Sequence, residues 1–330
     1  MENILITCPG NMYTGGPTLA HQLCNVLNLN GIDSKMYYIG KSEKPVHDNY
    51  LSFSNPYLTF DEKTEAKTVV ILETQTYLVD KIKADKKYIW WMSVDNFFMG
   101  QASNVDRFLK KLKIKEFDLY NVMKKTRNKT AALVQRKDVY HLVQSEYARL
   151  FLIDNGVPEN KIYHLADYIE DQVVEASDAA LREEKKFRVL YNPKKGFKFS
   201  KKIIDKMTDV EFVPLIGLNK GQVIDLLKTS SVYIDFGNHP GMDRFPREAV
   251  LCGCCVLTGK RGAAKNKVDV PISDKYKFDE IDESQIYRII EMINYIGNNY
   301  EIVKHDYDQY REIVKSQKTQ FIEDALTIFG

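Results

Sequence analysis

The chain has no run of about 18 apolar residues, which is the length that a membrane-spanning helix needs. Its first residues, MENILITCPG, lack the basic stretch and long apolar run of a secretory signal. We therefore expect a cytoplasmic protein. With 330 residues, 44% hydrophobic residues and a net charge of +2, the chain has enough apolar material for two globular domains.

Cysteine is scarce, and its spacing is not that of a disulfide framework. The five cysteines are an odd number, and Cys252, Cys254 and Cys255 crowd into one apolar stretch without a CxxC pair. This arrangement favours buried thiols over the disulfides of a secreted protein. A zinc site at the crowded cysteines is the alternative, but no histidine or second cysteine pair follows nearby.

Strand and helix patterns alternate along the chain, as in α/β proteins with a parallel sheet. The polar, acidic stretch 170–186 is the predicted domain boundary, and 283–329 is predicted to be nearly all helical. We expect two Rossmann-like domains, 1–170 joined by about 310–330, and 171–309. Strands are predicted at 4–8, 35–39, 68–72, 88–92, 139–143, 161–165, 187–191, 210–214 and 232–236, and helices at 17–29, 146–155, 200–207, 220–229 and 245–251.

The segment 232–259, VYIDFGNHPGMDRFPREAVLCGCCVLTG, carries the strongest functional signal. An apolar strand runs into a loop that contains Gly241 and then into a helix start with Arg244 and Arg247. Free N–H groups at a helix start, with arginines beside them, favour phosphate. Glu248 has the acceptor-only chemistry to take two hydrogen bonds from a ribose diol. The pattern indicates a nucleotide diphosphate; a solvated ion-pair cluster is the alternative.

A second basic turn, YNPKKG at 191–196, follows a predicted strand. Asn192 and the following proline fix the turn, and Lys194 and Lys195 are the cations that it offers to a phosphate. A hydrated surface turn is the alternative. The loop KRGAAKNK supplies two cations of second rank, Arg261 and Lys265.

In the first half of the chain, YIWWMSVDNFFMG at 88–100 ends an apolar strand with flat rings and polar groups suited to a sugar. Trp90 and Trp91 point to opposite faces of a strand, so at least one of them is expected in the core. The acceptor-side candidates are Trp91, Ser93 and Asn96.

Gly15 and Gly16 precede the first predicted helix. Glycine lets a loop approach a donor phosphate or an acceptor closely without steric cost. An ordinary helix entry, with Pro17 at the first helical position, is the alternative.

Residues 110–137 are strongly basic, with ten lysines and arginines against Glu116 and Asp118. Such a segment is either a solvated face or a contact for an anionic membrane surface. Nucleic acid is not expected as a partner, because the overall charge is balanced and no single-strand binding signature is present.

Four segments, in order along the chain, resemble the GT-B glycosyltransferases, in particular the family 4 branch. Family 4 enzymes usually place two glutamates eight positions apart, and here Pro240 stands eight before Glu248, so only the second glutamate carries over. The segments are TGGPTLAHQLCNVLNLNG (14–31), HLVQSEYARLFLIDNGVPENKIYHLADYI (141–169), YNPKKG (191–196) and PREAVLCGCCVL (246–257).

The resemblance implies two Rossmann-like domains that face a central cleft, with the nucleotide sugar in the second domain and the acceptor in the first. It also implies that cations and helix ends, without a metal or other cofactor, stabilise the leaving diphosphate. Asp95 lies where such enzymes keep catalytic groups and is the candidate general base of an inverting reaction, although retention is favoured. His239, Asp243 or backbone N–H groups are the candidates for the work of the missing glutamate. His239, next to Pro240 and Gly241, is the candidate donor to a phosphate oxygen.

The sequence thus predicts a glycosyltransferase that moves a sugar from a nucleotide diphosphate sugar to a glycan or lipid-linked acceptor, in surface polysaccharide or glycoconjugate synthesis. A catalytically silent nucleotide-sugar-binding partner protein is one alternative. A Rossmann-type epimerase or oxidoreductase is another, but CPGNMYTGG stands where its GxGxxG would follow the first strand.

Overall fold

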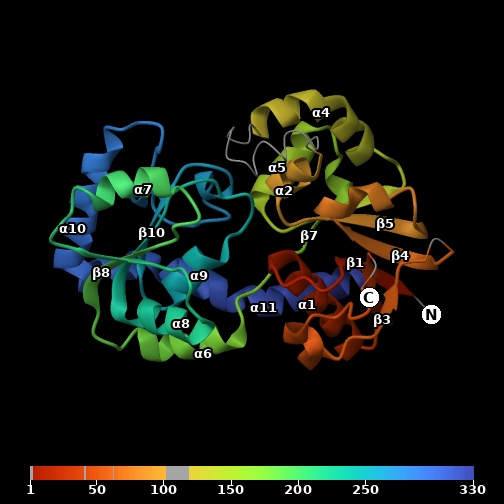
Figure 1. The fold of residues 1–330 in the computed structure, drawn as a ribbon, viewed down its shortest axis with the longest axis horizontal. Coiled ribbons are helices and arrows are strands. Elements are labelled where there is room, and N and C mark those ends of the chain that lie inside the picture. Colours follow the sequence, from red (N-terminus) through yellow and green to blue (C-terminus); the bar gives the residue numbers. More distant parts are fainter. Residues whose placement is uncertain (1–2, 41, 62, 102–118) are drawn as a thin grey trace. The chain divides into compact units, whose positions relative to one another are not determined.

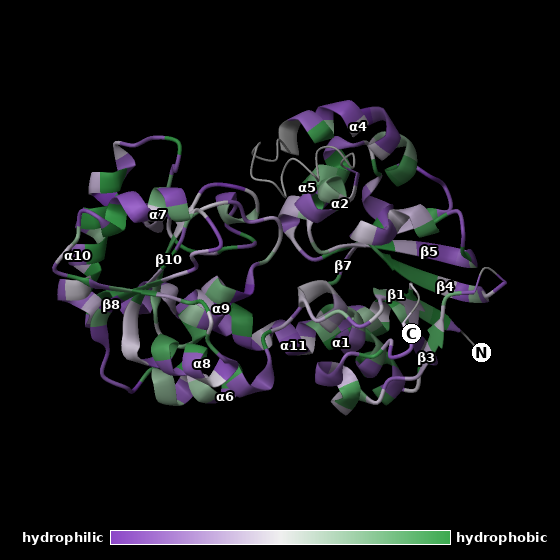
Figure 2. Ribbon diagram, viewed as in Figure 1, coloured by the Kyte–Doolittle hydropathy of each residue, from purple (hydrophilic) through white to green (hydrophobic). Residues whose placement is uncertain are grey.

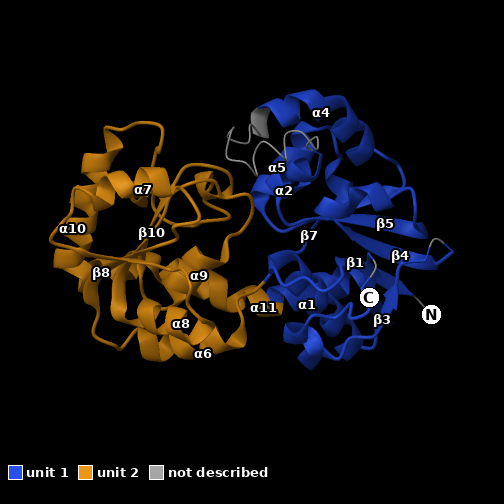
Figure 3. Ribbon diagram, viewed as in Figure 1, with its two compact units in different colours: residues 1–167, 320–330 blue, residues 168–319 orange. Residues whose placement is uncertain are grey.

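The computed structural model describes residues 3–40, 42–61, 63–101 and 119–330 (Figure 1). The chain divides into two compact units (Figure 3): unit 1 comprises Met1–Asp167 and Gln320–Gly330, and unit 2 comprises Tyr168–Thr319. Both units are built from a parallel sheet with helices, so the predicted α/β class is confirmed.

In the described residues, unit 1 contains a seven-stranded sheet in the order β3-β2-β1-β4-β5-β6-β7, and its neighbouring strands are parallel. The order reverses at the β1/β4 pair, which is the switch point of this sheet. The strands are β1 (Ile4–Pro9), β2 (Ser34–Ile39), β3 (Tyr57–Thr59), β4 (Glu65–Leu72), β5 (Lys83–Trp91), β6 (Val139–Val143) and β7 (Ile162–His164).

Helices cover this sheet because each has an apolar stripe. Helix α1 buries Leu19, Leu23 and Val26, which recur at helical spacing on one face. In α5, the Ser145 hydroxyl caps the first turn by accepting from the Ala148 N–H at 3.2 Å. The elements are α1 (Gly15–Leu29), η1 (Asp48–Phe53), η2 (Glu73–Leu78), α2 (Val94–Gln101), α4 (Leu119–Val134), α5 (Glu146–Asp154) and η3 (Glu159–Lys161).

Unit 2 contains, in its described residues, a five-stranded sheet in the order β12-β11-β10-β8-β9, again with parallel neighbours. Every residue of β10 is buried, as expected for a strand with a helix layer on both faces. In Figure 2, hydrophobic residues colour much of β4 green. The strands are β8 (Lys186–Tyr191), β9 (Glu211–Pro214), β10 (Ser230–Asp235), β11 (Cys255–Gly259) and β12 (Lys277–Phe278).

The unit 2 sheet is covered by helices and short 3₁₀ turns. They are α6 (Asp171–Ala180), α7 (Phe197–Ile204), α8 (Lys220–Thr229), α9 (Arg244–Leu251), η4 (Ala263–Lys265), η5 (Asp274–Tyr276), α10 (Gln285–Val303), η6 (Lys304–Tyr307) and the first part of α11 (Asp308–Phe329).

The polar, acidic stretch 170–186, predicted as the domain boundary, contains helix α6. This helix buries Val173, Ser177 and Ala180, which lie on one face, and leaves its acidic residues toward solvent. The small apolar stripe is enough to pack the helix on unit 2, whereas the acidic composition of the stretch suggested a loop.

Helix α11 begins in unit 2 and ends in unit 1. Tyr310 and Val314 are buried in the unit 2 core. Farther along the same helix, the Phe321 ring stacks on Trp90 at 6.5 Å, and Phe329 contacts Tyr88 at 5.4 Å. The second part of α11 therefore completes the core of unit 1.

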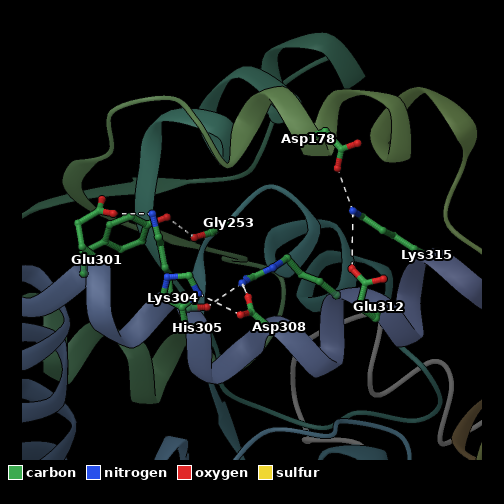
Figure 4. A network of polar contacts seen from close by, with 10 residues as sticks. Asp178, Gly253, Glu301, Lys304, His305, Asp308, Glu312 and Lys315 are labelled. Carbon is green, nitrogen blue, oxygen red and sulfur yellow. Dashed lines mark hydrogen bonds and ion pairs between the residues drawn. The ribbon is translucent and has the colours of Figure 1, made fainter.

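A polar network fixes the first part of α11 to the rest of unit 2 (Figure 4). Lys315 Nζ lies 2.9 Å from Asp178 Oδ1 of α6. At the α10–α11 turn, the Tyr300 hydroxyl donates to the Gly253 carbonyl at 2.8 Å, and Arg311 donates to the Lys304 carbonyl at 2.8 Å. The Lys315 contact ties α11 to α6, and the Tyr300 contact ties the preceding helix α10 to the loop after α9.

The five cysteines are free and buried, which confirms the prediction of buried thiols. Burial raises the pKa of Cys252 and of Cys254 to about 12, so both stay protonated at neutral pH. Within residues 3–40, 42–61, 63–101 and 119–330, no helix has the length and apolar content that crossing a membrane requires.

Candidate active site

The switch point of the unit 2 sheet lies between β8 and β10, where the strand order reverses. Two loops leave the carboxyl ends of these strands, the β8–α7 loop at 192–196 and the β10–α9 loop at 236–243. Ligands of open α/β sheets bind at this position. The two basic segments singled out in the sequence therefore meet at one edge of one sheet.

Two glycines let these loops pack backbone to backbone. Gly196 has φ +55°, and a Cβ there would lie 2.0 Å from the Phe236 carbonyl oxygen. Gly237 has φ +115°, and its Cβ would lie 2.8 Å from the Gly196 nitrogen. No other residue fits either position without displacing the backbone. The close packing fixes where Lys195, next to Gly196, can place its ammonium group.

Four charged side chains form a compact cluster between the loops. Lys195 Nζ is ion-paired with Asp243 Oδ2 and lies 3.9 Å from Asp235 Oδ1. His239 Nδ1 lies 2.8 Å from the same Asp243 oxygen, and its Nε2 lies 3.2 Å from the Asp235 carbonyl oxygen. The Tyr233 hydroxyl donates to Asp235 Oδ2 at 2.9 Å. Two cations thus face two carboxylates.

The charges in this cluster depend on one another. Burial raises the pKa of Asp235, although Lys195 and His239 act against it. Burial opposes the charged form of His239, but the hydrogen bond to Asp243 and the charge of Asp235 outweigh it and raise the pKa of His239. For Asp243, burial is outweighed by the bond from His239 and the charge of Lys195, so its pKa is lowered.

This environment changes the role expected for His239. The side chain is buried, and both ring nitrogens face oxygens of Asp235 and Asp243. A phosphate contact through either nitrogen, as the sequence suggested, would require breaking one of these contacts. In this arrangement His239 contacts Asp243, which is in turn ion-paired with Lys195.

Arg244 begins α9 and keeps about a quarter of its side chain exposed. Its Nη2 donates to Glu170 Oε1 at 2.9 Å, and its Nε lies 3.7 Å from Glu248 Oε1. Lys220 pairs with the second oxygen of Glu170. Among the described residues, the buried Nε–H of Arg244 has no hydrogen-bond acceptor. A buried donor of this kind is costly unless a ligand or water completes it.

Arg247 does not offer its charge to a ligand, and the sequence-based prediction is corrected here. Its side chain is 1% exposed. The guanidinium donates to the carbonyl oxygens of Met242 at 3.0 Å and Asp243 at 3.2 Å, and to Gln317 Oε1 at 2.9 Å. Arg247 stabilises the β10–α9 loop because its guanidinium donates to two main-chain carbonyls of that loop.

The β8–α7 loop is a turn of the predicted kind. The Asn192 side-chain oxygen accepts from the Lys194 N–H at 3.0 Å, while the Lys194 side chain is exposed. In the other loop, Gly241 is buried. Of the two adjacent lysines, only Lys195 enters the charged cluster.

A cavity of about 400 Å³ opens beside the β8–α7 loop. The Glu280 side chain, nine-tenths buried, lies 3.9 Å from the Arg261 guanidinium, and a Cβ at Gly259 would collide with it. Arg261 therefore lies close to the switch point, whereas Lys265 is exposed in η4. The cavity is lined by Gly196, Phe197, Lys198, Phe199, Lys202, Arg261, Glu280 and Ile281.

Two of the acceptor-side predictions in unit 1 are corrected. Trp91 is fully buried, and its Nε1 donates to His141 Nδ1 at 3.0 Å, so its ring presents no face to a sugar. The Ser93 hydroxyl accepts from the Asn96 N–H at 3.1 Å and caps α2. Burial lowers the pKa of His141 to about 4, which keeps it neutral and structural.

The remaining unit 1 candidates lie at the carboxyl edge of its sheet. Asp95 is buried in the first turn of α2, with Asn96 partly exposed beside it. Burial and then the Asp95 charge raise the pKa of Tyr147 to about 12, which places these two side chains near each other. A Cβ at Gly15 would meet nothing within 4 Å, and one at Gly16 only Met92 Sδ, at 3.5 Å.

Sequence reasoning missed three acids at these sites: Asp235, Glu170 and Glu73. Glu73 follows β4 at the unit 1 switch point, and its side chain is 4% exposed. Burial raises its pKa to about 8. In the described part of the chain, Glu73 Oε2 has no hydrogen-bond partner. The signal available in the sequence was their position, because the carboxyl residues Asp235 and Glu73 stand directly at the ends of apolar strands.

No known protein-family profile and no curated protein matches the chain. Solved structures with a similar fold do match it. Anabaena Alr3699/HepE in complex with UDP-glucose superposes with a TM-score of 0.61 at 11% identity, covering 99% of each chain. Sucrose-phosphate synthase (tll1590) from Thermosynechococcus elongatus gives a TM-score of 0.65 at 12% identity, covering 99% of this chain and 97% of that one. The chain has the GT-B fold.

A third GT-B structure, the lipopolysaccharide outer core galactosyltransferase WaaB, is similar over 99% of each chain with a TM-score of 0.61 and 11% identity. The fold that the four sequence segments predicted is therefore confirmed. The two Rossmann-like domains of this GT-B chain are unit 1 and unit 2, and the charged cluster described above belongs to unit 2.

The basic segment 110–137 of this GT-B chain falls partly outside the described residues, which resume at 119. Four of its cations are exposed along α4: Lys124, Lys125, Arg127 and Lys129. Arg136 is paired with Asp80 at 2.5 Å and with Asp138 at 2.9 Å, so its charge is matched locally.

Proposed function

We propose that the chain is a glycosyltransferase that moves a sugar from a nucleotide diphosphate sugar to a glycan or lipid-linked acceptor. The observation that carries the proposal is the unfilled Nε–H donor of Arg244 at the start of α9, the helix that follows the β10 loop at the unit 2 switch point, where GT-B topology and helix polarity favour an anion. The HepE structure, which shares the fold, holds UDP-glucose.

In this proposal unit 2 binds the donor. Lys195 and Arg244 contact the diphosphate together with the N–H groups that open α9. Glu248 lies one turn into α9 with its side chain mostly buried, and it accepts hydrogen bonds from the ribose hydroxyls. Arg244 is held between Glu170 and Glu248, so a single guanidinium links the phosphate and ribose contacts.

Transfer breaks the bond between the anomeric carbon and a diphosphate oxygen and forms a bond to an acceptor hydroxyl oxygen. The negative charge that builds on the diphosphate is stabilised by Lys195 and Arg244 in place of a metal. Retention is favoured, and the acceptor proton then passes to the departing diphosphate. In an inverting reaction Asp95 of unit 1 would take that proton. Asp243 acts by orienting Lys195.

The acceptor side of the proposal rests on unit 1. The exposed cations of α4 fit a protein that works on a lipid-linked acceptor at the cytoplasmic face of a membrane, since each contributes about 1 kcal/mol near an anionic surface. Sedimentation with phosphatidylglycerol vesicles, compared with phosphatidylcholine vesicles, tests this part separately.

Calorimetric titration with UDP, GDP, ADP and dTDP tests the donor site. We expect one nucleotide to bind the wild type, and Arg244→Gln to weaken it roughly 10- to 100-fold. Arg288→Gln, which removes an exposed arginine of α10 in the same unit, is the matched control and should bind like the wild type. Equal affinity in wild type and Arg244→Gln would refute the site assignment.

One second candidate has an observation in its favour. Pro240 stands where the family pattern has its upstream glutamate, which fits a nucleotide-sugar-binding protein without turnover. Release of nucleotide from a bound nucleotide sugar, followed with and without acceptor glycans, separates the two. Binding without any release favours the silent protein, whereas NADH binding would point to the oxidoreductase alternative.

A further inference from the structure

The loop after β1 leaves the unit 1 sheet at its switch point, beside β4. Its backbone is fixed at two positions: the Gly10 N–H donates to the Ile39 carbonyl at 3.2 Å, and the Asn11 N–H donates to the Pro45 carbonyl at 2.7 Å. Asn11 has φ +50°, a left-handed conformation that costs a non-glycine residue energy. Strained loop positions of this kind concentrate at functional sites.

This fixed loop presents the ring of Tyr13 to solvent. The residue is 53% exposed, although its ring is not loose. It stacks on His47 with centroids 5.4 Å apart and planes 19° apart, and it contacts Tyr50 at 5.5 Å. His47 is held in turn, because its Nδ1 accepts from the Asn49 N–H at 3.2 Å.

Behind Tyr13 a ladder of buried rings continues into the unit. Tyr50 stacks on His21 at 4.1 Å, and its hydroxyl lies 3.0 Å from Thr18 Oγ1. The Tyr38 hydroxyl lies 3.0 Å from His21 Nε2. The exposed ring is therefore the outer end of a rigid stack, and ordering it on a ligand would cost little further entropy.

We propose that Tyr13 is the platform on which a pyranose ring of the acceptor stacks. This inference rests on the proposed glycosyl transfer. The face of a phenol ring is electron-rich and the C–H face of a pyranose is its apolar side, so the two surfaces match. The Tyr13 hydroxyl remains available at the ring edge for a sugar hydroxyl.

Saturation-transfer NMR with four methyl glycosides, the α- and β-anomers of methyl glucoside and methyl galactoside, tests the platform without turnover. We expect saturation of pyranose C–H protons in the wild type and in Tyr13→Phe, and its loss in Tyr13→Ala. Tyr77→Ala is the matched control, because Tyr77 is a tyrosine of comparable exposure, 57%, in η2 of the same unit. No saturation in the wild type, or equal saturation in Tyr13→Ala, overturns the proposal.

Kinetics separate this inference from the proposed function. With an active acceptor, Tyr13→Ala should raise its KM roughly tenfold and leave UDP affinity and donor hydrolysis in water unchanged. If Tyr13→Ala lowers UDP affinity together with acceptor use, the variant has a folding defect and the platform is rejected. Comparing the melting temperatures of the variant and the wild type checks for this defect. If UDP fails to bind the wild type, the proposed function fails, whatever the glycosides show.

Discussion

The switch points of the two sheets have the same topology and different chemistry. In unit 2 the loops bring Lys195, His239 and two aspartates into a buried ionic cluster. In unit 1 the loop after β1 presents Tyr13 at the end of an aromatic stack, and the buried carboxyl of Glu73 follows β4. The comparison shows that the fold determines where a ligand can bind, whereas the loop residues determine which kind of ligand binds there.

The two sites also respond differently to pH. In unit 2 each charge depends on its partners, so a change in one protonation state alters the others. In unit 1 burial lowers the pKa of His21 to about 4, so this ring of the stack stays neutral at ordinary pH. We therefore expect the unit 1 stack to keep its structure over the pH range in which the unit 2 cluster rearranges.

The largest difference should appear in a pair of glycine substitutions. Gly196→Ala puts a Cβ 2.0 Å from the Phe236 carbonyl at φ +55°, and should lower the free energy of unfolding by about 2–4 kcal/mol. Gly15→Ala meets nothing within 4 Å and should change it by less than about 1 kcal/mol. Urea unfolding followed by circular dichroism measures both. Equal losses would show that unit 2 does not depend on close loop packing.

Removing the central cation of unit 2 should have the next largest effect. Lys195→Met leaves His239 as the one remaining cation of the cluster against Asp235 and Asp243, and should reduce nucleotide affinity about 100-fold, or about 2.7 kcal/mol. Lys194→Met removes the exposed neighbouring lysine and should cost less than threefold. Calorimetry compares the two, and an equal loss in both variants would contradict the assignment of Lys195.

The buried Glu73 carboxyl of unit 1 should make the free energy of unfolding depend on pH. Its pKa rises from 4.5 to about 8 on folding, so between these values the folded chain holds a proton that the unfolded chain has lost. The free energy of unfolding therefore falls as pH rises through this window, by up to about 1.4 kcal/mol per pH unit. Glu73→Gln keeps the neutral form and should flatten the fall. Parallel wild-type and variant profiles from pH 5 to 8 would show that Glu73 is not neutral.

The smallest effect is expected at a corrected residue. Ser93→Ala removes the cap of α2 and should cost about 1 kcal/mol of stability. Because this hydroxyl serves the helix, the KM for acceptor should not change. A raised KM with unchanged stability would return Ser93 to the acceptor site.

The architecture could be read from the sequence because the apolar runs of parallel strands are long and regular. The strand expected at 139–143 and the helix at 220–229 have the observed bounds. Helix α6 was missed because its buried face uses Ser177 and Ala180, whose polarity and size give a weak pattern. The short edge strands β3 and β12 were missed because so few residues show no periodicity.

The candidate site was only partly readable. The sequence located both basic turns, because glycine and proline mark the ends of buried strands. It could not tell Arg244 from Arg247, since both lie in the first turn of α9 and only the packing turns Arg247 inward against Gln317. The sequence could not show that the Trp91 ring is buried in the core. Its burial depends on the hydrogen bond to His141, which forms only in the folded sheet.

The path of α11 has a consequence for how the chain is made. Unit 1 contains Met1–Asp167, yet it also needs Phe321 and Phe329, which pack on Trp90 and Tyr88. Domains usually fold as they leave the ribosome, amino-terminal ones first. Here unit 1 cannot complete its aromatic core until unit 2 has been translated, because Phe321 and Phe329 are synthesised last. During that interval part of the core stays uncovered, and we expect the nascent chain to bind a chaperone.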